Sequence, residues 1–401
     1  MKDSVALYNK KRSVFAHAVM PCRIHVPDSF SPAPVTVVIP ACAEYPGILE
    51  TFDCLRSLKK APAIMCTVNH REDAAAEIKE NNRLLIAAAL QYGVCVLDCT
   101  QPGSELKKNE GVGSARRIGM DYALLTGAQV IACMDADTLV CPQYGRYLHD
   151  FFVRCTALQT EGKKTLAGAV CAFTHQKAQN APLQQAIDAY EFFIKEHSAR
   201  LYAAGTPFYP YALGPSIVCS AQGYAEAGGM NRRVAGEDFY FLQALIKIHM
   251  QYDAALKKTE RPDRFLFPEL ACTVYPQARL SDRTLFGTGQ KLADILAGGR
   301  DVQKKDKTAV RASLLYPDTV YERLAGLIGL LRERIKHPQD FPDVCAVSFP
   351  RVYDFLVRER FLHVWEKICA QNGKDSRRLE CAFHTWFDGL KILRLIHYLT
   401  R

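Results

Sequence analysis

Two carboxylates stand one residue apart, directly after a short apolar run. The run covers residues 130–134, and Asp135 and Asp137 follow it in the segment VIACMDADTLV. A run that is apolar at every position is typical of a strand buried on both faces of a parallel sheet, and ligands of such sheets bind beyond the carboxyl ends of the strands. Because alternate residues of an extended chain point the same way, both acids can face one site and hold Mg²⁺ or Mn²⁺.

A second acidic pair, Glu237 and Asp238, opens a predicted helix in the segment VAGEDFYF. The positive end of the helix dipole favours carboxylates there, and a helix holds a catalytic base rigidly beside a site. Both acidic pairs also have explanations without function. An acid pair after a strand can face solvent, and acids in the first turn of a helix can simply stabilise it.

Two arginine pairs have the chemistry to bind a phosphate. Arg116 and Arg117 follow a glycine turn in GVGSARRIG, where they suit either a phosphate or a carboxylate partner. Arg279 and Arg283 flank a Ser-Asp turn before a Gly-Thr-Gly segment, a combination suited to a diphosphate. A solvated helix face and a surface loop are the alternatives. The GxGxxG pattern of dinucleotide-binding dehydrogenases fails, because Arg116 stands where its last glycine belongs and a charged loop precedes it.

The elements that must position these residues alternate between strand and helix, which indicates a parallel α/β sheet. We expect Pro40 to end the first strand, because proline cannot donate to the ladder, and the loop after it to hold a base or ribose. The predicted strands cover residues 35–39, 63–68, 94–97, 130–134, 166–173, 217–220 and 265–273. The predicted helices cover roughly residues 47–59, 72–92, 143–160, 183–203 and 224–230, with a further helix from residue 237.

After residue 301 the chain shows helical patterns without strand candidates. Residues 320–335, 349–370 and 377–399 have apolar spacing of three and four, separated by turn-forming segments. We therefore expect a lead segment at 1–34, an α/β domain at 35–300 and a helical domain at 301–401. The helices are amphipathic and basic, so they either pack on a neighbouring domain or contact a membrane peripherally.

Composition places the chain among soluble globular proteins. It has 401 residues, 49% of them hydrophobic and 23% charged, and a formal charge of +9. That excess suits phosphate ligands or an anionic membrane surface without requiring either, and we expect no nucleic-acid partner. The 15 cysteines are scattered without a CxxC pair. They predict buried free thiols in a reducing cytoplasm, and no signal peptide or membrane-spanning run is expected.

Taken in order, VVIPACAE, VNH, GVGSARRIG, MDADT, YAEAGGM and AGEDFYF resemble the motifs of the family 2 glycosyltransferases, from Val35 to about Gly289. The resemblance implies the α/β GT-A fold, a mostly parallel sheet flanked by helices, here with a C-terminal all-helical extension. It also implies an inverting, metal-dependent transfer of a sugar from a nucleoside-diphosphate sugar to an acceptor hydroxyl.

Carried over residue by residue, the resemblance assigns roles to the positions that match. Two positions depart from the family pattern. Asn69 stands where many relatives have an aspartate that contacts the nucleobase of the donor, and Arg117 replaces an asparagine. The implied donor contacts are Pro40, Ala41, Glu44, Asn69, Arg116, Asp135 and Arg283. The implied metal ligands are Asp137 and Asp135, for Mg²⁺ or Mn²⁺, and the implied catalytic residues are Asp238 as base and Glu237 beside it.

Two other functions stay open at this stage. A sugar-phosphate nucleotidyltransferase has a related fold but usually places a glycine-rich basic loop after the first strand, where this chain has ACAEYPG. A non-catalytic nucleotide-sugar-binding scaffold is the second alternative, and the intact Asp135, Asp137 and Asp238 favour an enzyme over it. The donor sugar, the base, the acceptor and the oligomeric state are not determined by the sequence. We expect a cytoplasmic protein, peripheral at the inner face of the membrane if the C-terminal helices bind lipid.

Overall fold

The computed structural model describes residues 3–17, 19–211, 213–233, 236–280, 288–297 and 314–401. The chain divides into two compact units, which are described separately. The sheet unit comprises Met1–Ile187, Ala212–Ile248 and Pro268–Gln303. The helical unit comprises Asp188–Tyr211, His249–Phe267 and Lys304–Arg401. The division into three domains expected from the sequence stays a prediction.

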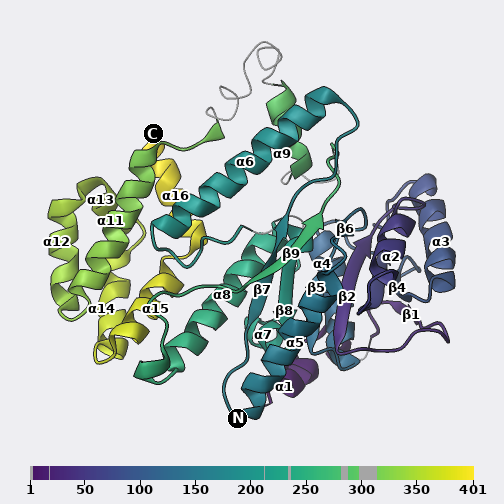
Figure 1. Cartoon of the computed structure of the whole chain (residues 1–401), viewed down its shortest axis with the longest axis horizontal. Helices are drawn as coiled ribbons and strands as arrows, with labels where there is room; N and C mark the ends of the chain where they lie inside the picture. The colour runs from purple at the N-terminus through teal and green to yellow at the C-terminus, as the bar shows by residue number, and fades with distance from the viewer. Residues whose placement is uncertain (1–2, 18, 212, 234–235, 281–287, 298–313) are drawn as a thin grey trace. The chain divides into compact units, whose positions relative to one another are not determined.

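One nine-stranded sheet organises the sheet unit, in the order β1-β4-β3-β2-β5-β8-β7-β9-β6 (Figure 1). Strands β4, β3, β2 and β5 run parallel, as do β7 and β9, whereas the other four pairings are antiparallel. The sheet is therefore mixed, and the predicted α/β class is confirmed. The strands are β1 (Arg23–His25), β2 (Val35–Ala41), β3 (Ala63–Asn69), β4 (Cys95–Cys99), β5 (Val130–Cys133), β6 (Leu139–Val140), β7 (Gly168–Phe173), β8 (Ile217–Ser220) and β9 (Glu269–Tyr275).

The four central parallel strands are apolar because they are covered on both faces. Every residue of β2, β4 and β5 is buried, as the continuous apolar runs predicted. Helix α4 packs on β2 and β3 through Gly119, where a Cβ atom would lie 2.7 Å from Oγ1 of Thr67. The helices of this unit are α1 (Ser4–Lys11), α2 (Ile48–Arg56), α3 (Ala76–Gln91), α4 (Val112–Leu125), α5 (Tyr144–Thr160), α7 (Ala221–Ala227), α9 (Thr288–Ala297) and the first parts of α6 (Ala181–Ala203) and α8 (Glu237–Ala255).

The prediction that Pro40 ends the first strand is wrong, because β2 continues to Ala41. Pro40 pairs with Thr67 of β3 in the parallel register, whereas the pairing of β2 with β5 stops at Val38. The carbonyl of Val38 accepts from the amide of Met134 in the segment after β5, so the backbone of Pro40, two residues on, faces the same side. That side has no β5 partner at Pro40, so the missing N–H leaves no ladder bond unmade.

Four further elements differ from the sequence prediction. The strand expected at 265–273 lies at Glu269–Tyr275, because Phe265 and Phe267 are buried in the helical unit without belonging to a strand. Strands β1 and β6 have three and two residues and left no pattern to detect. The lead segment contains helix α1, whose Tyr8 hydroxyl donates to the fully buried Asp121 at 2.7 Å.

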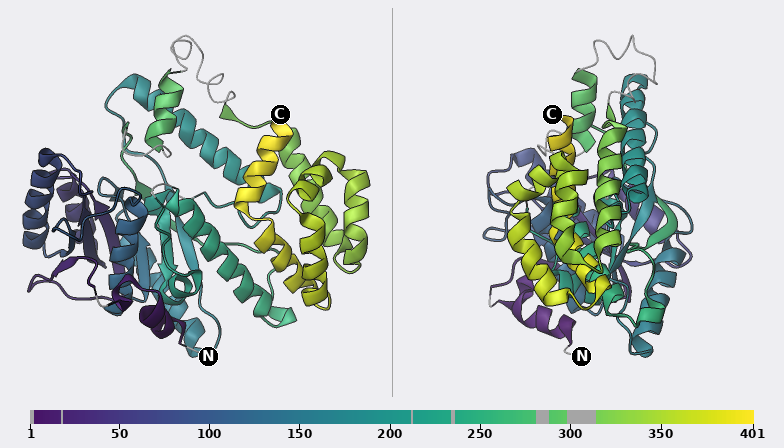
Figure 2. Two further views of the ribbon diagram at one scale, coloured as in Figure 1. Left: turned by 180° about the vertical axis from the view of Figure 1, so that it is seen from behind. Right: turned by 90° about the vertical axis from the view of Figure 1, so that its left-hand side faces the viewer.

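The helical unit confirms the predicted all-helical C-terminal region, with shorter helices than expected. Residues 349–370 break at Arg360, which has φ 62°, and residues 377–399 break where Asp388 caps the next helix. Its helices lie side by side in both views of Figure 2. They are α11 (Asp318–Arg334), α12 (Phe341–Ser348), α13 (Pro350–Arg358), α14 (Phe361–Asn372), α15 (Ser376–Trp386) and α16 (Gly389–Thr400).

Within the described ranges, no helix combines the length and the apolar character needed to cross a bilayer. All 15 cysteines lie in these ranges, and none of them forms a disulfide. The prediction of free, mostly buried thiols is therefore confirmed.

Candidate active site

The two acids of DADT lie in the loop between β5 and β6. Three contacts fix this loop: the amide of Thr138 donates to the carbonyl of Asp135 at 3.3 Å, and the Thr51 hydroxyl donates to the carbonyl of Ala136 at 2.9 Å. The side chain of Gln176 donates to the carbonyl of Asp137 at 2.8 Å. The backbone of both acids is therefore held from α2 and from the segment after β7.

Arg116 of helix α4 joins the two acidic pairs that the sequence singled out. Its Nη2 atom donates to Oδ1 of Asp135, and its Nε atom donates to Oε1 of Glu237 at 3.3 Å. The residue is 3% exposed. Of the two partners that the sequence left open for Arg116, a phosphate or a carboxylate, the structure shows the carboxylate.

Two glycines let these segments approach closely enough. A Cβ atom on Gly113 would lie 2.6 Å from the carbonyl oxygen of Arg233 and 3.0 Å from Cβ of Glu237, so α4 contacts the segment that leads into α8. A Cβ atom on Gly214 would collide with the guanidinium of Arg116. Gly113 and Gly119 of GVGSARRIG thus serve the close packing of α4 rather than a dinucleotide.

Arg279 makes the corresponding link on the other side of DADT. Its Nε atom lies 2.8 Å from Oδ2 of Asp137, and its two terminal nitrogens donate to both carboxylate oxygens of Glu44 at 3.1 and 3.2 Å. Strand β6 pairs with β9, with Leu139 opposite Tyr275. This pairing brings the segment after β9 beside the DADT loop, so Arg279 reaches Asp137.

The loop that carries Glu44 is clamped by two consecutive asparagines of α3. Oδ1 of Asn82 accepts from the amide of Ala43 at 2.8 Å, and Ala43 has φ 55°. Asn81 pairs with both the amide and the carbonyl of Tyr45, at 3.0 and 2.7 Å. The clamp therefore fixes the backbone on both sides of Glu44.

Asn69, the predicted base contact, ends β3 and is oriented by the backbone. Its Nδ2 atom donates to the carbonyls of Ala41 at 2.9 Å and Thr67 at 3.2 Å, and its own carbonyl accepts from Nδ2 of Asn82 at 2.9 Å. Pro40 and Ala41 lie buried inside β2 beside it. These predicted donor contacts therefore gather at the carboxyl ends of β2 and β3.

The site has a surplus of negative charge, and the pKa values reflect it. The pKa of Asp137 is raised to about 6. Burial is the main cause, and the charge of the neighbouring Asp135 adds to it more than the charge of Arg279 takes away. Burial also raises the pKa of Glu237 and of Asp238. Five carboxylates, those of Glu44, Asp135, Asp137, Glu237 and Asp238, face two guanidinium groups, those of Arg116 and Arg279.

The two acids of α8 are differently placed. Glu237 is 5% exposed and paired with Arg116. Asp238 is half-buried, accepts from the amide of Phe239 at 2.8 Å and has no cation partner among the described residues. Glu237 is thus held in place by Arg116, whereas the Asp238 carboxylate can accept a proton from a ligand.

The carboxylates fit a divalent cation that takes part of its ligands from a substrate. No three His, Cys, Asp or Glu side chains form a complete metal-binding group within the described parts of the chain. Mg²⁺ needs no such group, because it binds one or two carboxylates and completes its shell with phosphates and water. Burial first and the charge of Asp135 second raise the pKa of Asp137, and a bound cation would relieve both effects.

The structure brings nine of the ten predicted site residues to this region, and their roles stay predictions. Arg279, not selected as a site residue, reaches Asp137, whereas Arg283 lies outside the described residues. Arg117 contacts a different carboxylate, with its Nε atom 3.6 Å from Oδ2 of Asp121, and donates to the carbonyls of Met230 and Arg12, each at 2.8 Å. Asn81 and Asn82 were missed because side-chain bonds to a loop backbone leave no sequence pattern.

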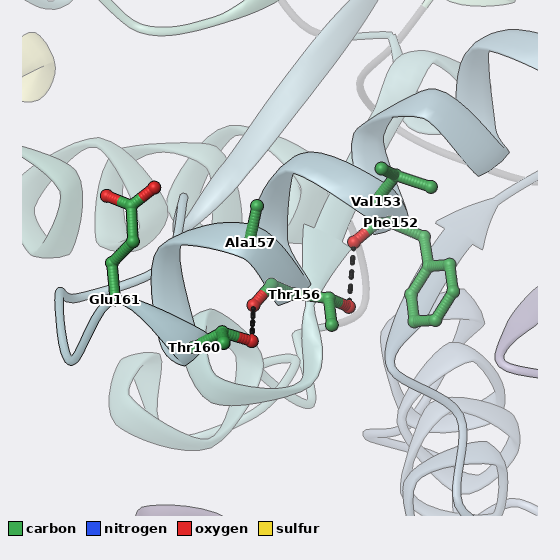
Figure 3. A pocket seen from close by; sticks show the side chains of 6 residues that line it. All are labelled: Phe152, Val153, Thr156, Ala157, Thr160 and Glu161. Carbon is green, nitrogen blue, oxygen red and sulfur yellow. Dashed lines mark hydrogen bonds between the residues drawn. The ribbon is translucent and has the colours of Figure 1, made fainter.

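A shallow hollow on the outer face of α5 is unrelated to this chemistry. Figure 3 shows its six lining residues on one helix and its C-terminal cap, with the Thr156 and Thr160 hydroxyls bonded to the helix itself. None of the residues discussed above lines it.

No family model and no curated protein matches this sequence. Three of the solved structures that are similar at low levels are given below. TarS 1–349 of S. aureus in complex with UDP-GlcNAc has a TM-score of 0.39 and 11% identity, over 87% of this chain and 91% of that one. The mannosyltransferase PcManGT of Pyrobaculum calidifontis, in complex with GDP-Man and Mn²⁺, has a TM-score of 0.37 and 12% identity, over 96% of this chain and 95% of that one.

The third is glucosyl-3-phosphoglycerate synthase of Mycobacterium tuberculosis, in complex with Mn²⁺, UDP and glucosyl-3-phosphoglycerate. Its TM-score is 0.33 and its identity 13%, over 66% of this chain and 77% of that one. At these scores and identities a likeness assigns neither a family nor an activity. The function of this chain therefore has to follow from its own side chains.

Proposed function

We propose that this chain is an inverting, metal-dependent glycosyltransferase of the family 2 type, which moves a sugar from a nucleoside-diphosphate sugar to an acceptor hydroxyl. The observation that carries the proposal is the position of Arg116, bonded to both Asp135 and Glu237. It joins the acids after β5, which suit a cation and a diphosphate, to the helix that starts with the candidate base. The order of motifs along the sequence independently supports the same reaction class.

The charge of the site supports a requirement for metal. A nucleoside diphosphate adds negative charge to a region where, among the described residues, the five carboxylates named above face the guanidinium groups of Arg116 and Arg279. Asp137, assisted by Asp135, would hold Mg²⁺ or Mn²⁺, and the bound ion would neutralise the charge that develops on the leaving diphosphate. Glu44 and Asn69 would lie along the nucleotide, with Pro40 and Ala41 shaping the end of β2 beneath it.

Asp238 is the proposed general base. Its carboxylate forms no ion pair with the described residues, and burial raises its pKa toward the operating pH, which favours proton transfer from an acceptor hydroxyl. Glu237 pairs with Arg116 and fixes the first turn of α8. A single in-line displacement by the activated hydroxyl inverts the sugar's anomeric centre and needs no covalent intermediate.

A thermal-shift panel tests the donor class. UDP-, GDP-, CDP- and dTDP-sugars are added with Mn²⁺, Mg²⁺ or EDTA to the wild-type protein and to Asp137→Ala. One nucleotide should raise the melting temperature of the wild type only with metal, and Asp137→Ala should abolish that shift. If no nucleotide sugar binds under any condition, the proposal fails. If one binds but is never turned over, the chain is a nucleotide-sugar-binding scaffold.

We further propose a cytoplasmic protein whose C-terminal helices contact an anionic membrane surface. Residues 302–401 carry more basic than acidic side chains, which suits such a contact. Flotation of the full chain with vesicles tests this proposal. Binding to vesicles rich in phosphatidylserine but not to neutral ones is expected, and equal behaviour with both contradicts it.

A further inference from the structure

The guanidinium of Arg279 occupies the carboxylates that a metal ion would need. It lies 2.8 Å from Asp137 through Nε and pairs in parallel with both oxygens of Glu44 through its other two nitrogens. Its side chain is 39% exposed, so it is free to move on one side. In the protein without ligands, Arg279 therefore supplies the positive charge that balances this half of the site.

A divalent ion and this guanidinium compete for the same oxygen atoms. A cation bound to Asp137 shields its charge and repels a guanidinium held less than 3 Å from that carboxylate. The pairing with Glu44 does not depend on Asp137, and it keeps the displaced side chain near the site. A donor diphosphate offers Arg279 a new anionic partner with the bidentate geometry that guanidinium prefers.

We propose, on the basis of the function proposed above, that Arg279 binds the diphosphate of the donor, and that a divalent ion on Asp137 releases it for this role. Metal and nucleotide then strengthen each other's binding, because each ligand, when it binds first, removes an unfavourable step from the binding of the other. The metal alone must break the contact between Arg279 and Asp137. The nucleotide alone must draw Arg279 away from Asp137 and approach the carboxylates without a metal ion.

Binding of each ligand to the full-length chain separates this role from a structural one. Mn²⁺ alone is titrated by electron paramagnetic resonance of the free ion. UDP, GDP, CDP and dTDP are then titrated calorimetrically at saturating Mn²⁺. The variants are Arg279→Gln and Arg279→Lys. The matched control is Arg83→Gln, which removes one exposed arginine charge from α3, where Arg83 pairs with Glu80.

Opposite effects on the two ligands are expected. Arg279→Gln should bind Mn²⁺ alone roughly 3- to 30-fold more tightly than the wild type, because the competing guanidinium is gone. It should bind the accepted nucleoside diphosphate about 10-fold more weakly at saturating Mn²⁺, because a charged partner is lost. Arg279→Lys should keep the Mn²⁺ affinity near the wild-type value but weaken the nucleotide, and Arg83→Gln should change neither.

Three results overturn the inference. Unchanged or weaker Mn²⁺ binding in Arg279→Gln shows that Arg279 does not compete for Asp137. Loss of both ligands together shows a structural role. If the wild type binds none of the four nucleotides with Mn²⁺, the proposed function fails, and with it the diphosphate role of Arg279, whereas the Mn²⁺ titration still decides whether the arginine and the ion compete.

Discussion

The Nε atom of Arg116 donates to Oε1 of Glu237 across 3.3 Å, although 121 positions separate the two residues in the chain. The same guanidinium donates to Asp135, so one buried cation fixes the acids of two distant segments. Burial alone lowers the pKa of Arg116, but the surrounding carboxylates, Asp135 first, more than offset this and raise the pKa above its ordinary value. Arg116 therefore connects the loop after β5 to the start of α8 within the candidate site.

Replacing Arg116 should damage stability and catalysis together. Arg116→Met leaves Glu237 and Asp135 without their counter-charge, and breaking a buried pair in this way costs about 3–5 kcal/mol. The melting temperature should fall clearly, and turnover should drop by on the order of 100-fold as the base loses its support. Arg83→Met, on an exposed helix face, is the control. Near-wild-type stability of Arg116→Met would contradict the connection.

The asparagine clamp of α3 should affect donor binding more than turnover. Asn82→Ala removes the bonds to Ala43 and Asn69, at a cost of about 1–3 kcal/mol of folding free energy. The loop that carries Glu44 then loosens, so KM for the donor should rise several-fold while kcat changes little. Asn372→Ala, which removes one bond to Ile368 within the helical unit, is the control and should leave KM unchanged.

The acid limb of the pH–rate profile should report the acids of α8. Both Glu237 and Asp238 have pKa values raised by burial, so the protonated, inactive base persists above the ordinary range for aspartate. The rate should therefore rise with pH as this pair loses its proton. Glu237→Gln removes a neighbouring negative charge and should move the limb to lower pH. An unmoved limb would assign the proton to a different group.

His384 in the helical unit should be a source of acid sensitivity. It is fully buried, and neither ring nitrogen has a hydrogen-bond partner among the described residues. Burial lowers its pKa to about 4. Between pH 6.5 and 4 the histidine is protonated in the unfolded chain but stays neutral in the folded one. Its contribution to the free energy of unfolding therefore falls as pH falls.

His384→Phe should remove this effect. The variant's stability advantage over the wild type should widen as pH drops from 7 to 5, by on the order of 2 kcal/mol in urea unfolding. His363→Phe, at an exposed position of α14, is the control. A destabilisation that is equal at both pH values would mean that an ordered water pairs with the ring.

The sequence predicted the parts of this fold that depend on local pattern. Continuous apolar runs predicted β2, β3 and β5. Because parallel strands have their carboxyl ends at one edge of the sheet, the polar residues that follow these strands were expected to lie close together. Arg116 and Glu237 were both singled out, because arginine after a glycine turn and acids at a helix start are local signals.

What escaped prediction depends on pairing between distant segments. Arg279 reaches Asp137 because the two-residue strand β6 pairs with β9, and a strand of that length has no periodicity to detect. The segment before β9 looked like strand because Phe265 and Phe267 are apolar, yet they are buried in the helical unit. The clamp by Asn81 and Asn82 depends on backbone groups, which no residue pattern displays.

The most direct test of the central claim is turnover of the nucleotide sugar selected by the binding panel. Release of the nucleoside diphosphate is measured for the wild type, Asp137→Ala and Asp238→Asn, with Mn²⁺ and with EDTA. The account predicts metal-dependent release by the wild type, none by Asp137→Ala, and a loss of on the order of 100-fold or more for Asp238→Asn with donor binding retained. Wild-type rates in Asp238→Asn, or release that ignores both metal and Asp137, would contradict it.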